Sequence, residues 1–292
     1  MARHAHTTAL TRRFVVLAVA LAALAAMACG GDTAAPATPS ATTSAGSSAP
    51  VATAPPVTGE IIVSAASSLT EAFTDTAKAF EVKYAGTKVT LNFASSAALA
   101  TQVNEGSPAD VFASADRAQM DAVKTERKSA AGAVFALNRL LIAKPKGSTA
   151  VATYADLAKP NLKVILAADG VPVGSYAIQS LAAAEKSVAF GTGFQAKVMA
   201  NVKSREANVR AVLTKVQLGE ADAAIVYSTD VATAPEVEPV AIPDAYNVTG
   251  EYFIAPLTGG KNANTAAAFV AFVRSTEGQA FLTKRGFAIP PR

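Results

Sequence analysis

The stretch NFASSAALATQVNEGSPADVFASAD, residues 92–116, decides the fold class of this chain. KVTLNF at 88–93 alternates apolar and polar residues as a strand does. Helical spacing follows from about Ser96 to Glu105, and Gly106 ends the helix. ADVFA at 109–113 then predicts a second strand. A strand, a helix and another strand in this order indicate an α/β protein with largely parallel sheets.

The same alternation continues on both sides of this stretch. Before it, a strand at 60–65 precedes a helix with apolar residues from Leu69 to Tyr84 at helical spacing. The C-terminal part, 264–287, is predicted to be mostly helical, with breaks at Gly278 and Gly286. The remaining predicted elements are strands at 140–143, 164–167 and 223–227, a helix after Gly174, and a helix from about Val209 to Leu218.

Hydroxyl and amide residues recur where a strand meets a helix. At the carboxyl ends of parallel strands such junctions face one ligand-binding edge. Helix N-termini there offer unpaired N–H groups that bind anions without a cationic side chain. Ser68 and Ser96 are also candidate helix caps, and a role as caps alone is the competing interpretation. The junction residues are Ser67, Ser68, Ser95, Ser96, Gly174, Ser175 and Asn208, and Asp116 can cap a further helix.

The residue types that the folded part lacks exclude several classes of function. Both histidines, His4 and His6, and the single cysteine, Cys29, precede the folded part. This excludes a Ser-His-Asp triad, a Cys-His pair and metal sites built on His or Cys in that part. An enzyme that uses a Ser-Lys pair or carboxylates stays open. A dense basic stripe with interleaved aromatics is absent, so nucleic acid is not indicated.

The N-terminus reads as an export signal. Three arginines precede an apolar run from Phe14 to Ala28, which is short for a membrane span. The predicted signal peptide covers 1–28. Ala26-Met27-Ala28 fits ordinary signal cleavage, but the stretch also resembles a bacterial lipobox. We favour the lipobox, with Cys29 lipidated, because a lone thiol is a liability in an oxidising compartment.

Residues 29–58 are rich in Ala, Thr, Ser and Pro and predict a disordered tether. Residues 59–292 are long enough for a substantial core. Without the three leader arginines the chain carries 23 basic and 22 acidic residues, so the folded part is nearly neutral. A surface adhesion or scaffolding module would need a broad apolar or aromatic patch, yet the chain has no Trp and few aromatics.

Five motifs, taken together, resemble the periplasmic molybdate-binding proteins of ABC transporters. They cover nearly all of the folded part, in family order. They are AASSLTEAF (65–73), residues 92–116 as quoted above, VPVGSYAIQSL (171–181), AIVYSTD (224–230) and FLTKRGFAIP (281–290).

The resemblance implies a type II periplasmic-binding-protein fold, in which two α/β lobes close over a tetrahedral oxyanion held by neutral donors. Carried over by motif, Ser68 and Ser96 would offer hydroxyls and N–H groups. Val173 and Val209 would each offer a backbone N–H, and Tyr227 its phenol. Val173 departs from the family, where a smaller Ala is familiar, which puts the pocket width in doubt.

The implied lobes are 59–138 plus 230–292 and 139–229, with crossings near 137–140 and 227–230. The implied partner is the membrane permease of an ABC importer, and the expected protein is monomeric, without a cofactor. The expected location is the outer face of the cell membrane, in the periplasm or outside the cell. Molybdate or tungstate is the expected ligand. Sulfate or thiosulfate stays open, whereas phosphate would benefit from a carboxylate acceptor that the five positions lack.

Overall fold

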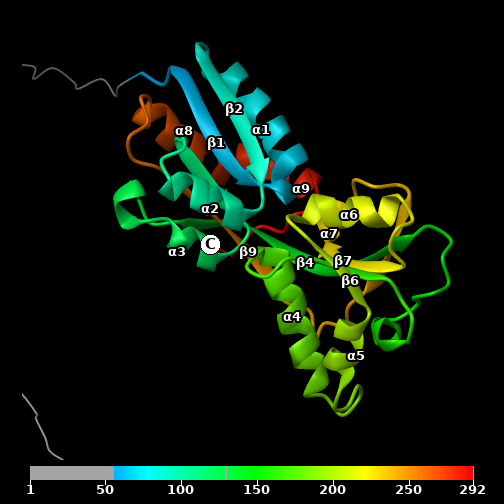
Figure 1. Cartoon of the computed structure of the whole chain (residues 1–292). Helices are drawn as coiled ribbons and strands as arrows, with labels where there is room; N and C mark the ends of the chain where they lie inside the picture. Colours follow the sequence, from blue (N-terminus) through cyan, green and yellow to red (C-terminus); the bar gives the residue numbers. More distant parts are fainter. Residues whose placement is uncertain (1–55, 129, 292) are drawn as a thin grey trace, which may run out of the picture. The chain divides into compact units, whose positions relative to one another are not determined.

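The computed structural model describes residues 56–128 and 130–291 (Figure 1), within a compact unit formed by Thr53–Arg292. The predicted signal peptide, Cys29 and the tether up to residue 55 lie outside the described residues. The tether was predicted to end at residue 58. However, Thr58 donates its N–H to Thr265 Oγ1 at 3.1 Å and accepts from that hydroxyl at 2.6 Å. Val57 also packs against the core, so the folded part begins slightly earlier than predicted.

The described strands form one sheet in the order β2-β1-β3-β9-β4-β7-β5-β6, with β8 paired to β4. We call β2, β1, β3, β9 and residues 133–139 of β4 the first half of this sheet, and the remainder the second half. The strands are β1 (Gly59–Ala66), β2 (Thr87–Ala94), β3 (Val111–Ser114), β4 (Ala133–Pro145), β5 (Val164–Ala167), β6 (Val202–Glu206), β7 (Ala223–Tyr227), β8 (Val237–Ala241) and β9 (Thr249–Pro256).

Each half contains three neighbouring strands that pair in parallel. β1 pairs in parallel with β2 and β3, and β5 pairs in parallel with β6 and β7. The pairings of β9 and β4 are antiparallel. The α/β architecture is therefore confirmed, and the parallel pairing holds for the three outer strands at each end of the sheet. The sheet as a whole is mixed because β4 and β9 run opposite to their neighbours.

The helices bury apolar faces against the sheet (Figure 1). On α1, Phe73 and Phe80 are fully buried and meet the ring of Phe269 on α8. The described helices are α1 (Thr70–Lys83), α2 (Ser96–Asn104), α3 (Arg117–Ala122), α4 (Pro172–Glu185), α5 (Phe194–Ala200), α6 (Val209–Gln217), α7 (Ser228–Val231), α8 (Ala263–Arg274) and α9 (Thr276–Lys284), with short 3-10 turns η1 (Ser67–Leu69), η2 (Thr125–Arg127) and η3 (Tyr154–Ala158).

Two predicted helix boundaries are wrong. The helix expected after Gly174 begins at Pro172, because Pro suits the first helical position. The C-terminal break lies at Ser275, whose hydroxyl accepts from the N–H of Gly278 at 3.2 Å. Gly278 itself lies inside α9, and only glycine fits there because a Cβ would come within 2.0 Å of the Phe272 carbonyl oxygen. It permits the close turn between α8 and α9 and does not end a helix.

Strand β4 carries the chain from one half of the sheet to the other. Residues 133–139 pair with β9, whereas Leu140 and the residues after it pair with β7 and β8. This change of partner falls inside the predicted crossing near 137–140. Strand β8 pairs with the second half, although residues 230–292 were assigned to the first lobe. We therefore propose that the return crossing lies after β8, between Ala241 and Thr249.

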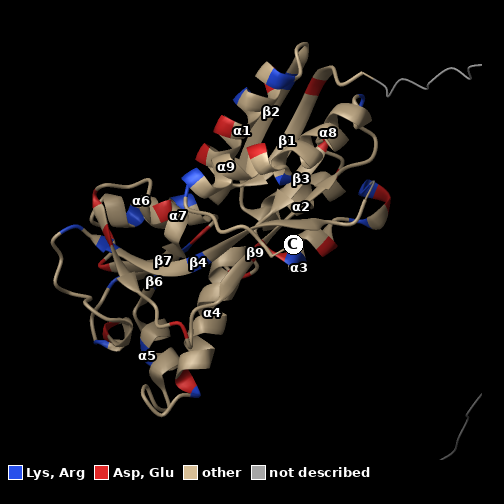
Figure 2. Cartoon of the chain, turned by 180° about the vertical axis from the view of Figure 1, so that it is seen from behind, with Lys and Arg blue, Asp and Glu red and all other residues tan. Residues whose placement is uncertain are grey.

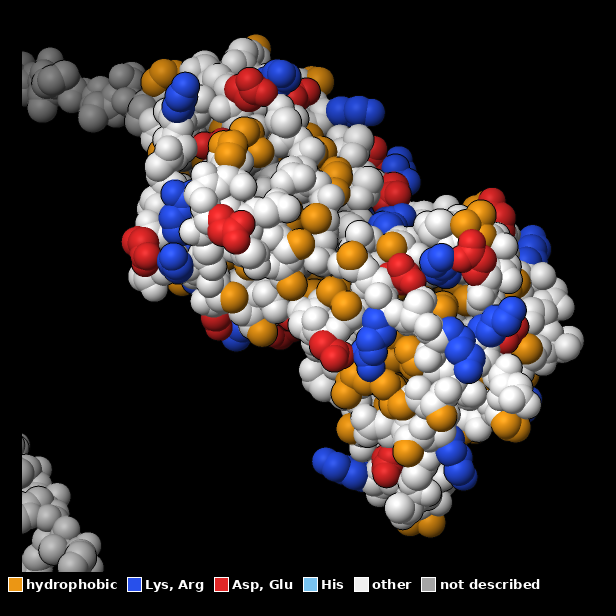
Figure 3. Space-filling view, viewed as in Figure 1, with side chains coloured by type: hydrophobic (Ala, Val, Ile, Leu, Met, Phe, Trp, Pro, Cys, Tyr) orange, Lys and Arg blue, Asp and Glu red, His pale blue; other side chains and the backbone are white. Residues whose placement is uncertain are grey.

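Charge is distributed without a dominant sign. Figure 2 shows basic and acidic residues interspersed along the outer helices, and the space-filling view in Figure 3 shows the same mixture on the face it presents. Several of these charges form surface pairs, such as Lys83 with Glu277 and Lys88 with Glu60. Among the residues placed by the structure, no helix is long and apolar enough to cross a membrane.

Candidate functional site

Four helix starts meet around one small cavity at the carboxyl ends of the strands. The cavity measures about 10 Å³, close to the least space that holds a small molecule such as water. The cavity is lined by Ala66, Ser67, Ser68, Ser95, Ser96, Ala115, Val171, Pro172, Val173, Val209 and Tyr227.

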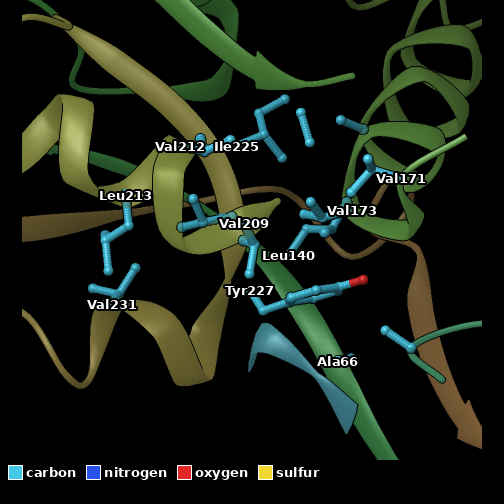
Figure 4. Close-up of a cluster of buried hydrophobic side chains, with 14 of the residues drawn as sticks. Ala66, Leu140, Val171, Val173, Val209, Val212, Leu213, Ile225, Tyr227 and Val231 are labelled. Atoms are coloured by element: carbon cyan, nitrogen blue, oxygen red, sulfur yellow. The ribbon is translucent and has the colours of Figure 1, made fainter. Parts of the chain in front are cut away.

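All five predicted binding residues lie in this lining, although they come from distant parts of the chain. Ser68 belongs to η1 and Ser96 opens α2, both in the first half. Val173 lies in the first turn of α4, Val209 opens α6, and Tyr227 ends β7. Figure 4 shows Tyr227 among Ala66, Val173 and Val209. The structure thus brings the predicted residues together, and their role as ligand donors stays a prediction.

The prediction that Ser68 and Ser96 cap helices is wrong. The cap of α2 is Ser95, whose hydroxyl accepts from the N–H of Ala98 at 3.3 Å. The hydroxyl of Ser96 instead accepts from the N–H of Ala115 at 2.9 Å. Ser68 lies in a 3-10 turn, and its hydroxyl bonds to the Tyr252 hydroxyl at 2.8 Å. Both hydroxyls are buried and are free of any capping duty.

The second half contributes backbone donors. Val173 and Val209 occupy the first turn of α4 and α6, where N–H groups have no partner within the helix. Asn208 caps α6 as predicted, accepting from the N–H of Ala211 at 3.0 Å. Gly174 lets α4 start against β5, because a Cβ there would lie 2.7 Å from the carbonyl oxygens of Ala167 and Ala168. This close approach places the N–H groups of α4 at the cavity.

Tyr227 carries a phenol that makes no hydrogen bond of normal geometry within the part of the chain that the structure describes. Its side chain is 1 % exposed, and its hydroxyl has no hydrogen-bond partner among the described residues. Burial raises the pKa of Tyr227 well above its ordinary value, so the phenol keeps its proton at neutral pH. A buried donor without an acceptor is costly. This unpaired hydroxyl belongs to a residue that lines the cavity.

No side chain with a formal charge lines the cavity. The nearest basic residue along the chain, Arg210, donates to the Ser67 carbonyl oxygen and the Glu71 carboxylate and lies 3.0 Å from Asp230. Its charge is therefore already compensated. A Lys or a carboxylate is absent from the lining, so the Ser-Lys and carboxylate enzyme hypotheses find no reacting pair there. The donor groups that these lining residues carry are hydroxyls and backbone N–H groups.

The helix starts add electrostatic attraction for an anion. Each N-terminus carries a partial positive charge from its aligned peptide dipoles. Within residues 56–128 and 130–291, no group of three or more His, Cys, Asp or Glu side chains is placed to hold a metal ion. Larger hollows exist, such as one of about 620 Å³ between α1 and α9, but it contains none of the predicted residues. The arrangement at the small cavity suits a compact oxyanion.

Sequence reasoning missed part of the site. Ala115 was not predicted, although it follows β3 at the same edge of the sheet. Asn138 and Tyr252, which support Ser68 from behind, were also missed. Tyr252 lies on the fully buried part of β9, where a tyrosine resembles any core aromatic. No local sequence signal distinguishes it.

Comparison with known proteins agrees with this geometry. The family model described as bacterial extracellular solute-binding protein matches residues 61–288. The molybdate-binding protein ModA of Mycobacterium tuberculosis is 38% identical over 233 residues, which cover 79% of this chain and 85% of the relative. ModA of Escherichia coli is 31% identical over 241 residues, covering 79% and 90%.

A solved structure shares the fold. The substrate-binding domain of a putative molybdenum ABC transporter from Clostridium difficile superposes with a TM-score of 0.61 at 25% identity. The match covers 80% of this chain and 100% of that domain. The two-lobed type II periplasmic-binding-protein fold predicted from the motifs is thereby confirmed. Because the family model spans most of the chain and two relatives exceed 30% identity, this protein belongs to the bacterial extracellular solute-binding proteins.

Proposed function

We propose that this protein captures molybdate outside the cytoplasm and delivers it to the membrane permease of an ABC importer. The observation that carries the proposal is the Tyr227 hydroxyl, which is buried, protonated and unpaired at a cavity lined by helix starts. An oxyanion oxygen supplies the acceptor that this hydroxyl lacks. The similarity to molybdate-binding proteins of two bacteria supports the choice of anion.

The cavity favours a fully ionised tetrahedral anion. Ser68, Ser96 and Tyr227 can each donate a proton, and the N–H groups of Val173 and Val209 can only donate. Each hydrogen bond to a charged group contributes roughly 1.5–3 kcal/mol, so five donors can hold a dianion stripped of water. Hydrogenphosphate carries a proton and finds no carboxylate to accept it. Tungstate has nearly the shape and size of molybdate, and we propose that it binds as well.

The remaining proposals concern how the protein is held and built. We propose that Cys29 is acylated and anchors the chain to the outer face of the membrane, while a tether gives the binding part its reach. In membrane fractionation, Cys29→Ser should then release the protein. Unchanged association would exclude the anchor. We further propose a monomer whose lobes follow the two halves of the sheet, so that closure encloses the anion between them.

Calorimetric titration of the purified protein tests the ligand directly. Molybdate and tungstate should bind with similar affinity, and sulfate much more weakly. Sulfate binding as tight as molybdate binding would favour the sulfate alternative. A second series at low and high salt should give nearly the same molybdate affinity, because screening acts mainly on exposed charges. A steep loss with salt would mean that cationic side chains bind the anion and that the donors named here are wrong.

A further inference from the structure

A chain of buried hydrogen bonds lies behind Ser68. The Ser68 hydroxyl is 2.8 Å from the Tyr252 hydroxyl, and the side-chain nitrogen of Asn138 donates to Tyr252 at 3.4 Å. The same nitrogen donates to Thr229 Oγ1 at 2.9 Å. Each of these residues is at most 3% exposed. The chain therefore connects the cavity with the crossing of β4, where water does not compete for these bonds.

The direction of the bonds in this series can be assigned because the series ends at a backbone N–H group. The N–H of Arg139 lies 2.9 Å from Asn138 Oδ1 and can only donate. The Ser228 hydroxyl donates to the same oxygen at 2.9 Å. The side-chain oxygen of Asn138 therefore faces Arg139, and its NH₂ group faces Tyr252. Since that NH₂ cannot accept, the Tyr252 hydroxyl accepts from Asn138 and must give its own proton elsewhere.

Ser68 is the acceptor that fits this proton. The Tyr227 hydroxyl also lies near Tyr252 but makes no hydrogen bond that meets normal geometry. Burial raises the pKa of Tyr252 above its ordinary value, so the phenol stays protonated at neutral pH. If Ser68 donated to Tyr252 instead, the Tyr252 proton would stay buried and unpaired, which is unfavourable. Accepting from Tyr252 leaves the Ser68 proton free for a ligand in the cavity.

The Ser96 hydroxyl also accepts a hydrogen bond from the protein, in this case directly from a backbone N–H. Its oxygen accepts from the N–H of Ala115 at 2.9 Å, and that N–H can only donate. Its own proton is then also available to the cavity. Two serines that could in principle either donate or accept are thus both biased towards donation. The bias at Ser68 depends on side chains, and so it can be removed by mutation.

We propose that Tyr252, held by Asn138, is a positioning residue that fixes Ser68 as a hydrogen-bond donor, so that the site selects oxyanions without a proton. The inference rests on the proposed function and adds a source of discrimination to it. A fully ionised anion such as molybdate satisfies every donor. Hydrogenphosphate points its own proton at a group that is already donating, which leaves both protons without an acceptor.

A double-mutant cycle tests whether Tyr252 acts through Ser68. Tyr252→Phe keeps the ring that packs edge-on against Phe135 and Phe287 and removes only the hydroxyl. We expect it to weaken molybdate binding about five- to tenfold in the parent. In the Ser68→Ala background the same change should cost less than about twofold, because its target is gone. Additive losses would overturn the proposal.

Selectivity gives a second readout that a purely structural role would not move. The preference for molybdate over hydrogenphosphate, measured by competition near neutral pH, should fall about fivefold in Tyr252→Phe. The reason is that the Ser68 hydroxyl can then turn and accept the proton of hydrogenphosphate. An unchanged ratio, with both affinities lowered together, would contradict the proposal. Tyr154→Phe is the matched control, since the Tyr154 hydroxyl also bonds to a buried serine, Ser180, at 2.9 Å. Neither residue belongs to the cavity lining. This variant should change neither affinity nor ratio.

These outcomes distinguish a failure of the proposed molybdate binding from a failure of the proposed role of Tyr252. If the parent protein binds no molybdate, the proposed function fails and the inference falls with it. If the parent binds molybdate but the cycle is additive and the ratio is unchanged, only the role of Tyr252 is wrong. Thermal unfolding of each variant shows whether it is folded before its affinity is interpreted.

Discussion

The two sides of the cavity offer donors of different kinds. The first half of the sheet presents the hydroxyls of Ser68 and Ser96, and each oxygen is already engaged by a protein group. The second half presents the N–H groups of Val173 and Val209 and the unpaired phenol of Tyr227. Hydroxyls can rotate and must be oriented, whereas backbone N–H groups are oriented by the helix itself. If these groups bind the ligand as proposed, we expect selectivity to be adjustable on the first side and fixed on the second.

Among these variants, Val209→Pro should lower molybdate affinity most, because it removes a backbone N–H donor from the second half. Val209 is the first residue of α6, where proline is tolerated, and Asn208 before it has the extended backbone that proline requires. Val209→Pro removes the N–H donor and should weaken molybdate binding up to about a hundredfold. Calorimetric titration measures the loss.

Val209→Ala is the control for this change, because it shortens the side chain but retains the N–H. It should keep most of the affinity and lose some stability through the smaller buried side chain. If Val209→Pro unfolds at nearly the parental temperature and still binds molybdate as tightly as the parent, the N–H of Val209 is not a ligand donor.

Tyr227→Phe should separate binding from stability. The phenol is unpaired and buried, so its removal relieves a cost in the free protein. We expect molybdate affinity to fall about tenfold or more, while the ligand-free protein unfolds at the same or a higher temperature. Thermal unfolding with and without molybdate measures both effects. Equal losses of stability and affinity would mean that the hydroxyl supports the fold rather than the ligand.

The two serines should differ from each other in stability. Ser68→Ala and Ser96→Ala each remove a donor and should lower affinity about tenfold. Ser96→Ala also leaves the N–H of Ala115 without its acceptor, which costs about 1–3 kcal/mol. Ser68→Ala removes the acceptor of the Tyr252 proton, but that proton can turn towards the neighbouring Tyr227 hydroxyl, so the loss of stability should be smaller. Equilibrium unfolding in denaturant compares the two.

Ser95→Ala provides the smallest expected effect on binding. Ser95 lines the same cavity, but its hydroxyl caps α2. Its loss should cost about 1 kcal/mol of stability and change molybdate affinity less than about twofold. A large loss of affinity in Ser95→Ala would move the donor role from Ser96 to its neighbour.

Local patterns in the sequence predicted many of the helices and strands and several of their ends, but they missed β6, β8, β9 and α5. The buried run 164–167 forms β5 with the predicted limits, and Asn208 and Asp116 cap α6 and α3 as expected. Such features depend on residues within one or two turns of each other. The five binding positions were obtained from the resemblance of motifs, and the structure brings them to one cavity.

Only the tertiary structure decided which partners these residues have. The sequence could not show that Ser68 bonds to Tyr252, 184 residues away, or that Ser96 accepts from Ala115. It also predicted caps at Ser68 and Ser96, whose hydroxyls bond to these distant partners instead. Hydrophobic periodicity and capping act over a few residues, so they can be read from the chain. The direction of a buried hydrogen bond depends on every group that packs around it, and packing joins segments that the sequence keeps far apart.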